Sequence, residues 1–334
     1  MISFKEQLPD FAGRYHGGSF MTVKPPDFGG KPYRSLDYHL RNRYGEKIYK
    51  VSLDGGMTCP NRDGTLGKCG CIFCSEGGSG DFAGDRTHPV HQQIEEQKTR
   101  LSPKFPATHF IAYFQAYTNT YAPLSYLERI FTEAIEHEDI VGLSIGTRPD
   151  CLPDETLDLL SELNKKKPVT VELGLQTIHE KTAKRIHRGY RLEVFEDAYR
   201  RLKEAGLTVV VHVILGLPGE TKEEMLETVD YLGKIPVDGI KLQLLHILKG
   251  SQMATEYEKN PFSLMELEEY LDLILTCVAR LPQSVVIHRL SGDGAKALLI
   301  GPAWSANKKL VLNRMMQKFR ENGIFQGCQR APQG

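Results

Sequence analysis

The sequence lacks any run of eighteen apolar residues, so it contains no candidate for a membrane-spanning helix. Its most apolar stretch, residues 207–218, is interrupted by Thr208, His212 and Gly216 and predicts a buried strand. The opening residues, MISFKEQLPD, lack the apolar core of a secretory signal peptide, and low-complexity tracts and internal repeats are also missing. We therefore expect a cytoplasmic protein with no membrane partner.

A net charge of one sign is lacking as well. The 334 residues include 42 Lys or Arg and 42 Asp or Glu, and 40% are apolar, which is an ordinary globular composition. The charge is unevenly distributed, because residues 1–50 hold nine basic against five acidic side chains and residues 299–334 hold six against one. The two basic ends could form a positively charged surface that binds a polyanion such as a nucleic acid, or their charges could simply be solvated. Composition leaves both interpretations open.

Cysteine is scarce and clustered, since four of the seven cysteines fall between Cys59 and Cys74. Without a secretory signal, such a cluster indicates metal ligands or redox groups rather than disulfides. Four thiolates would fill a zinc or iron–sulfur site, whereas three would leave one iron of a [4Fe–4S] cluster open. Cys69 and Cys71 are separated by one residue and would point in different directions on most loops. We therefore predict Cys59, Cys71 and Cys74 as ligands, with free thiols and a structural zinc loop as alternatives.

Short β-like runs alternate with amphipathic segments along most of the chain, which predicts βαβ units and a parallel sheet. Six or seven such units are too few for a closed eight-stranded barrel, so we expect an α/β fold with a partial (β/α)6-type parallel barrel. Residues 46–295 would form this barrel, between a basic N-terminal arm (1–45) and a basic C-terminal helical extension (296–334). The predicted strands are residues 48–53, 109–115, 140–145, 169–175, 207–215, 239–246 and 285–290.

Several helix starts are predicted from capping boxes, in which a hydroxyl precedes a carboxylate by three residues. The pairs are Ser125 with Glu128, Thr221 with Glu224, and Ser263 with Glu266. The last pair opens a predicted helix over residues 264–281, whose leucine, isoleucine and valine residues recur at helical spacing on one face.

Ligands of parallel barrels bind at the carboxyl ends of the strands, and polar residues follow the predicted strands at these points. Glu172 and Gln176 are four residues apart in one strand and would face the same side. Buried polar groups need partners, which could be the hydroxyls of a ligand or neighbouring strands. The fork of Arg148 could bind a carboxylate, or it could pair with Asp150 and fix the turn.

The motifs DGGMTCPNRDGT (54–65), TRPD (147–150), VELGLQT (171–177), RGY (188–190) and ILGLPGET (214–221), together with Cys-x11-Cys-x2-Cys, resemble a known family. The chain resembles the radical S-adenosylmethionine (SAM) superfamily, in the subgroup related to the catalytic subunit of Elongator. Within it, the chain is most similar to bacterial proteins of the MnmL (YtqA) and YhcC types. The gap between the first two cysteines departs from the superfamily's usual three residues. The resemblance covers roughly residues 45–295 and implies that this region is a radical SAM core.

The resemblance implies two cofactors, a [4Fe–4S] cluster on Cys59, Cys71 and Cys74 and SAM on its open iron. The reduced cluster would cleave SAM to a 5′-deoxyadenosyl radical that abstracts hydrogen from the substrate. A reducing partner such as flavodoxin or ferredoxin would supply the electron. The residues that the resemblance assigns to SAM are Phe73, Gln115, Tyr117, Glu172, Gln176 and Gly216, of which Gln115 and Tyr117 match by position alone.

The substrate implied by the resemblance is the wobble uridine in the anticodon loop of tRNA. 5-Carboxymethylaminomethyluridine, with or without a 2-thio group, would be converted to 5-aminomethyluridine, and Arg148, Lys241 or Arg289 would hold the carboxylate. A basic stretch between Lys308 and Arg320 would contact phosphates, or it would be a solvated helix packed through its apolar face. The alternatives are a radical SAM enzyme for another modified base or a small molecule, and a non-catalytic zinc-containing RNA-binding protein.

Overall fold

The computed structural model describes residues 25–330, except residues 79, 102–106 and 293. The first 24 residues of the predicted basic arm and residues 331–334 of the extension lie outside the described part of the chain.

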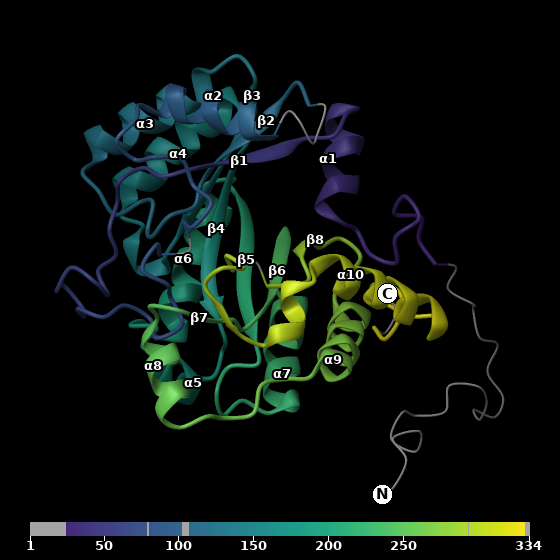
Figure 1. Ribbon diagram of the computed structural model, residues 1–334. Helices are drawn as coiled ribbons and strands as arrows, with labels where there is room; N and C mark the ends of the chain where they lie inside the picture. Colours follow the sequence, from purple (N-terminus) through teal and green to yellow (C-terminus); the bar gives the residue numbers. More distant parts are fainter. Residues whose placement is uncertain (1–24, 79, 102–106, 293, 331–334) are drawn as a thin grey trace, which may run out of the picture.

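Seven parallel strands form one sheet that curls into a half-barrel, as Figure 1 shows. The seven predicted strands are therefore confirmed, and the barrel has one strand more than a (β/α)6 count. The order is β1-β2-β3-β4-β5-β6-β8, so β1 and β8 are edges that do not pair with each other. The strands are β1 (Tyr49–Leu53), β2 (Phe110–Phe114), β3 (Ile140–Thr147), β4 (Val169–Gln176), β5 (Thr208–Leu215), β6 (Gly239–Leu244) and β8 (Val286–Arg289).

The sixth strand is shorter than predicted because the chain turns after Leu244. The short strand β7 (Ile247–Leu248) then pairs antiparallel with β9 (Leu299–Gly301) in a separate two-stranded sheet.

The alternation of side chains within β1 shows which residues face the helices and which face the barrel interior. Val51 and Leu53 are fully buried in the main core, whereas Lys50 points into the barrel interior and reaches a carboxylate on β4.

Helices surround the outer face of the sheet (Figure 1), and their apolar faces pack with the strands into one main hydrophobic core. The longer helices have hydrophobic residues at helical spacing, as an outer layer requires. The helices are α1 (Leu36–Tyr44), α2 (Val90–Leu101), α3 (Leu124–Glu136), α4 (Asp154–Lys166), α5 (Glu180–Arg185), α6 (Leu192–Glu204), α7 (Lys222–Lys234), α8 (Gln252–Lys259), α9 (Leu267–Arg280) and α10 (Lys308–Glu321), with 3-10 turns at Pro149–Cys151 and Ala303–Ala306.

One of the three predicted capping boxes is present. The Thr221 hydroxyl accepts from the Glu224 amide at 3.2 Å, and the Glu224 carboxylate accepts from the Thr221 amide at 2.8 Å. The prediction for Ser125 was wrong because α3 begins directly after Pro123. The prediction for Ser263 was wrong because α9 begins later, with Glu266 as its N-cap.

The C-terminal extension belongs to the same core as the barrel. Val311, Met315 and Phe319 of α10 are buried in that core beside α9. Gln326 is fully buried, donates to the Val285 carbonyl and accepts from the backbone amide of Arg34 at 2.8 Å. No helix in the described ranges has both the length and the apolar character needed to cross a membrane.

Two of the basic side chains that the sequence analysis offered for phosphate contact are used within the protein. Arg314 pairs with Glu268 at 3.0 Å, and the buried Lys318 pairs with Glu268 at 2.9 Å and with Asp272 at 2.5 Å. These two cations therefore fasten α10 to α9, and the apolar packing that was the alternative interpretation is also present.

Candidate active site

A cavity of about 160 Å³ lies at the carboxyl ends of the strands. It gathers residues from the cysteine loop and from six strands or the segments that follow them. All of the predicted site residues line it except Gly216. They are Cys59, Cys71, Phe73, Cys74, Gln115, Tyr117, Arg148, Glu172, Gln176, Lys241 and Arg289.

The cysteine loop places three thiols on this cavity and leaves the fourth outside it. Cys59, Cys71 and Cys74 line the cavity, whereas Cys69 is exposed to solvent and is not among the lining residues. The single glycine between Cys69 and Cys71 has φ of 77°, and the turn it makes separates the two side chains. Three thiols of the loop therefore line one cavity, and three is the number of thiolates that would leave one iron of a [4Fe–4S] cluster open.

The surroundings of Cys71 favour a thiolate. A hydrogen bond from Cys74 lowers the pKa of the Cys71 thiol to about 7, against the opposing effect of burial. The positive charges of Arg148 and Arg62 lower this pKa further, and the side-chain amide of Asn61 lies 3.5 Å from the Cys71 sulfur. Since the thiolate is the form that binds metal, the chemistry of this donor set fits a cluster.

The RGY segment fastens the cysteine loop to the end of β4. The side-chain amide of Asn61 donates to the backbone carbonyls of His187 at 2.8 Å and Arg188 at 3.2 Å. Arg188 is itself buried and donates to the carbonyls of Leu175 and Thr177 at the end of β4. We name Asn61 and residues 187–190 the loop brace. It contains side chains to which the sequence gave no role, although the RGY motif marked their position.

Arg148 is held by the protein rather than presented to a ligand. Its guanidinium makes two hydrogen bonds to Asp150, at 2.9 and 2.7 Å, and a third to the Arg188 carbonyl at 3.0 Å. Its face also lies over the Tyr190 ring, 4.9 Å from the centroid. A bidentate pair uses the fork that a substrate carboxylate would need. These contacts are those of the turn-fixing alternative, and the role expected for Arg148 in binding a carboxylate stays a prediction.

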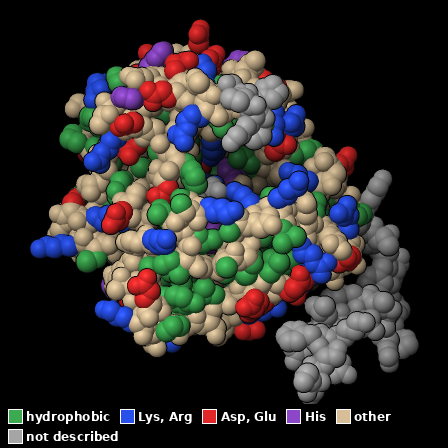
Figure 2. Space-filling view, in the orientation of Figure 1, with side chains coloured by type: hydrophobic (Ala, Val, Ile, Leu, Met, Phe, Trp, Pro, Cys, Tyr) green, Lys and Arg blue, Asp and Glu red, His purple; other side chains and the backbone are tan. Residues whose placement is uncertain are grey.

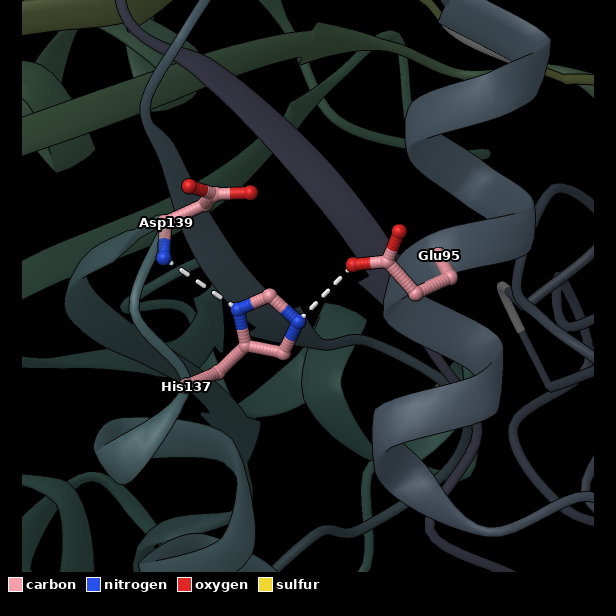
Figure 3. A group of neighbouring side chains, drawn as sticks. All are labelled: Glu95, His137 and Asp139. Carbon is pink, nitrogen blue, oxygen red and sulfur yellow. Dashed lines mark hydrogen bonds and ion pairs between the residues drawn. The ribbon is translucent and has the colours of Figure 1, made fainter.

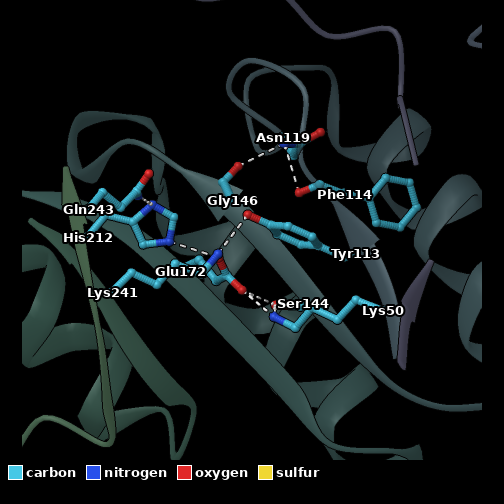
Figure 4. Close-up of polar contacts among 10 residues, drawn as sticks. All are labelled: Lys50, Tyr113, Phe114, Asn119, Ser144, Gly146, Glu172, His212, Lys241 and Gln243. Atoms are coloured by element: carbon cyan, nitrogen blue, oxygen red, sulfur yellow. Dashed lines mark hydrogen bonds and ion pairs between the residues drawn. The ribbon is translucent and has the colours of Figure 1, made fainter. Parts of the chain in front are cut away.

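A layer of polar side chains crosses the inside of the barrel, one from each of six consecutive strands (Figure 4). Glu172 of β4 lies at its centre and is fully buried. One carboxylate oxygen accepts from Ser144 at 2.7 Å and from Lys50, and the other accepts from His212 at 2.8 Å and from Lys241. We call these residues the polar layer: Lys50, Tyr113, Ser144, Glu172, His212 and Lys241.

These contacts show how Glu172 is held, and the role expected for it in binding SAM stays a prediction. Four protein donors occupy its two oxygens, so its carboxylate has no lone pair left for the ribose of SAM without losing one of them. The alternative weighed from the sequence, a core residue that joins neighbouring strands, describes this geometry. Lys50, Tyr113, Ser144 and His212 were not predicted, and the only signal for them is a polar residue alternating with apolar ones within a strand.

The polar layer has unusual titration properties. Burial opposes ionisation of Glu172, but the ammonium groups of Lys241 and Lys50 and the imidazole of His212 hold its pKa well below the ordinary value. Burial lowers the pKa of Lys241 to about 7, with added repulsion from Lys50 and Arg289. Burial also lowers the pKa of His212 to about 4, so its imidazole is neutral near pH 7. The polar layer therefore has an ionised carboxylate at its centre, in contact with two lysines.

Two of the residues assigned to SAM have backbone conformations that L-residues rarely adopt. Tyr117 has φ of 59° and Gln176 has φ of 68°, and both line the cavity. The Oε1 atom of Gln176 is buried without a hydrogen-bond partner among the described residues. Strained backbone and an unpartnered buried acceptor are features of ligand sites. Gly216 lies outside the cavity lining, with its amide 3.0 Å from the Met225 sulfur.

Figure 3 shows a second group of potential metal ligands, Glu95, His137 and Asp139, none of which lines this cavity. The Nδ1 atom of His137 accepts from the Asp139 amide at 3.2 Å, and its Nε2 faces Glu95 at 2.9 Å. The ammonium group of Lys98 contacts both Glu95 and Asp139 and supplies the positive charge. The group is therefore an ion-pair cluster that joins α2 to the start of β3.

Comparison with known proteins agrees with the geometry. Residues 59–232 match the profile of the radical SAM superfamily, and residues 237–321 match the radical SAM C-terminal domain. The chain is 44% identical over 297 residues to YtqA of Bacillus subtilis, covering 89% of this chain and 92% of that protein. It is 26% identical over 206 residues to the tRNA uridine(34) acetyltransferase of Methanocaldococcus jannaschii, covering 59% of this chain and 36% of that protein.

Among solved structures, the archaeal Elp3 of Methanocaldococcus infernus has a similar fold, with a TM-score of 0.62 and 18% identity over 84% of this chain and 64% of that one. The family profile covers more than half of the chain, and the match to YtqA covers nearly all of it. This protein therefore belongs to the radical SAM superfamily, in its Elongator-catalytic-subunit-like subgroup, and its cofactors are those of the family, a [4Fe–4S] cluster and SAM.

Proposed function

We propose that this radical SAM enzyme modifies the wobble uridine of tRNA, converting 5-carboxymethylaminomethyluridine, with or without a 2-thio group, to 5-aminomethyluridine. The observation that carries the catalytic part is the convergence of Cys59, Cys71 and Cys74 on a polar cavity at the carboxyl ends of a half-barrel. When bound, the cluster and SAM supply abstraction of a hydrogen atom from a carbon of the substrate.

The choice of tRNA is supported by the relatives. The matching region of the Methanocaldococcus jannaschii protein belongs to an acetyltransferase of uridine 34 in tRNA, and the similar fold is that of an Elp3. A modified base must leave its stack to enter a cavity inside a barrel, and bases of an anticodon loop are already unpaired. The partners of the enzyme would then be tRNA and a reducing protein such as flavodoxin or ferredoxin.

Different residues of the cavity would bind the cluster and SAM. Cys59, Cys71 and Cys74 would hold the cluster, and the loop brace would keep them facing the cavity. The unpartnered oxygen of Gln176 would accept from a hydroxyl of SAM, while Gln115, Tyr117 and Phe73 line the same wall. Gly216, with φ of 87°, would allow the backbone after β5 to approach the adenine.

The cluster assignment is tested by replacing single cysteines. Cys74→Ala should reduce bound iron and sulfide and abolish SAM cleavage, because a three-thiolate site cannot lose a ligand. Cys69→Ala is the matched control, since it removes an exposed thiol of the same loop and should keep both. Iron, sulfide and 5′-deoxyadenosine are measured after anaerobic reconstitution. Full SAM cleavage by Cys74→Ala would refute the assignment.

The substrate is tested by nucleoside analysis of tRNA from cells that lack the protein. The proposed reaction predicts that 5-carboxymethylaminomethyluridine accumulates and 5-aminomethyluridine disappears. Unchanged wobble nucleosides, together with intact SAM cleavage by the purified enzyme, would direct the search to another modified base or to a small molecule.

A further inference from the structure

Two further cavities, which we call the side cavities, adjoin the cavity of the candidate active site. One has a volume of about 140 Å³ and the other of about 330 Å³. Gln115 and Arg289 line both of them as well as the active-site cavity, so the three spaces meet at these residues. Figure 2 shows the hollow on this side of the molecule, between the positions that β1 and β8 have in Figure 1. A substrate that fills the active-site cavity can therefore extend into the side cavities.

Phe82 is an exposed aromatic residue that lines both side cavities. It is 43% exposed, and it is the only aromatic one of the exposed large hydrophobic residues in the described ranges, which are Leu66, Phe82, Leu124, Val194, Leu310 and Leu312. A single exposed hydrophobic residue is ordinary, so exposure alone supports no conclusion. Its position is informative, because no other member of this group lines any of the three cavities.

The other phenylalanine and tyrosine rings of these cavities already have partners. A cation lies over the ring of each tyrosine: Lys50 and Lys241 over Tyr113, Arg62 over Tyr117, and Arg148 and Arg188 over Tyr190. Phe73 is partly buried against a second apolar cluster. Within the described ranges, the Phe82 ring has no cation over it and no stacked or edge contact with another aromatic ring. Its face is therefore available to a ligand.

The backbone around Phe82 is held by contacts to α2 and β1. The Phe82 carbonyl accepts from the side-chain amide of the buried Gln97 on α2 at 3.3 Å. The Gly84 amide donates to the Ser52 carbonyl of β1 at 2.9 Å. A side chain on a fixed backbone loses little conformational freedom when a ligand packs against it, which favours binding.

We propose that Phe82 is the side chain on which the flipped wobble base of the RNA substrate stacks. The proposal rests on the proposed function and adds the residue that positions the base beside the active-site cavity. A base that leaves its stack loses the contact with its neighbours, and proteins that bind unstacked bases replace that contact with an aromatic ring. Because every base has a flat face, the stacking contact contributes affinity rather than base identity.

The stacking contact is tested by RNA binding, independently of turnover. Two anticodon stem–loop RNAs, one with 5-carboxymethylaminomethyluridine at the wobble position and one abasic there, are titrated with reconstituted enzyme and SAM but without reductant. Phe82→Ala should weaken binding of the RNA that carries the base by roughly 5- to 100-fold, as the loss of one stacked base predicts. It should bind the abasic RNA as tightly as the native enzyme does. Phe82→Tyr keeps the ring and should bind both RNAs nearly as tightly as the native enzyme.

The control is Leu124→Ala on α3, which removes a hydrophobic side chain of similar exposure, 39%, and should leave the binding of both RNAs unchanged. Equal affinity of Phe82→Ala and the native enzyme for the RNA that carries the base, or an equal loss for both RNAs, would overturn the stacking contact. Weaker SAM binding by Phe82→Ala without RNA would also overturn it, because the ring would then serve the cofactor.

Adding reductant tests the reaction separately. Base-dependent binding through Phe82 without formation of 5-aminomethyluridine overturns the proposed conversion alone. Formation of this product by the native enzyme, together with an unchanged affinity of Phe82→Ala, overturns the stacking contact alone.

Discussion

Gly189, within the loop brace, is a residue that no larger one can replace without cost. It has φ of 84°, and a Cβ atom there would lie 2.5 Å from the Asn61 side-chain oxygen and 3.2 Å from the Arg148 guanidinium. An alanine in this left-handed conformation costs about 1–2 kcal/mol of backbone strain alone. Because the Cβ atom would also clash with Asn61, we expect Gly189→Ala to lower the free energy of unfolding by more than this amount. Displacement of Asn61 should also weaken cluster retention, measured as iron per chain after gel filtration.

Gly206 provides a matched control for this substitution. It has a similar φ of 73°, but a Cβ atom there would have no neighbour within 4 Å. Gly206→Ala should therefore show the strain alone, with the iron content of the native protein. If the two variants have equal urea-unfolding energies and equal iron, the close approach of Asn61 has no structural importance.

Burial of Lys241 should change how the free energy of unfolding depends on pH. Its pKa is lowered to about 7 in the folded protein, whereas an unfolded lysine titrates at about 10.4. Between these values the unfolded chain binds a proton that the folded chain does not, so stability rises with pH, by up to about 1.4 kcal/mol per pH unit. Below pH 7 both states are protonated and the contribution no longer changes.

Lys241→Met should remove this slope. Urea unfolding of the cluster-free protein at about pH 7 and about pH 9 gives the slope for each protein, and other titrating groups are common to both. The groups that face Lys241 are Glu172, Tyr113, Lys50, His212 and Arg289. An equal slope in the two proteins would show that Lys241 is protonated in the fold throughout this range.

The residues of the site differ in how well the sequence predicted them. The sequence could predict that Cys69 lies outside the site of Cys59, Cys71 and Cys74, because a single residue separates Cys69 from Cys71 and this spacing is a local property of the chain. The partners of Glu172 come from strands far apart in sequence, and no pattern within β4 indicates that Lys50 is the residue that reaches it. A lysine in a strand is ordinarily solvent-facing, and only closure of the sheet into a half-barrel turns it inward.

At the level of elements, the helix α10 carries basic residues that form ion pairs with α9 and others that are exposed to solvent. Arg314 and Lys318 are paired with α9, while Lys309 and Arg320 are exposed and are eleven residues apart, on the same helical face. If tRNA binds along this face, the Lys309→Gln/Arg320→Gln variant should bind it more weakly. The slope of log affinity against log salt should fall by about two, because each of the two substitutions leaves one phosphate without its cation.

Arg314→Gln serves as the comparison for this variant, since its guanidinium is already neutralised by Glu268. It should leave the salt slope unchanged in the same titration of tRNA binding. An unaltered slope in the Lys309 and Arg320 double variant would place the phosphate-binding cations elsewhere on the enzyme and leave this face as solvated surface.

Strands were predicted more reliably than helix starts, for a physical reason. Each strand of a two-sided parallel sheet is a short apolar run, so its position is evident from local composition. Helix starts depend on which side chain caps the first turn. Pro123 and Glu266 hold those positions in α3 and α9, ahead of or behind the serines that matched the pattern.

At the scale of the whole molecule, the described residues at both ends of the chain pack against the barrel. α1 lies beside β8, where Ser35 bridges to Ile287, and α10 shares the main core with the barrel. Charge composition separated the ends from the middle, but their apolar residues determine where they pack. The described part of the arm and the extension are thus structural parts of the barrel's open side.

The polar layer has a consequence for anyone who wishes to redesign this scaffold. Replacing a buried ion pair by apolar groups of similar volume is often neutral or stabilising. A version with leucine and methionine in place of Glu172, Lys50 and Lys241 would therefore be expected to resist denaturation at least as well as the native protein. Such a barrel would be a solid, greasy plug. The natural sequence keeps a charged interior instead, which selection for stability alone would not preserve.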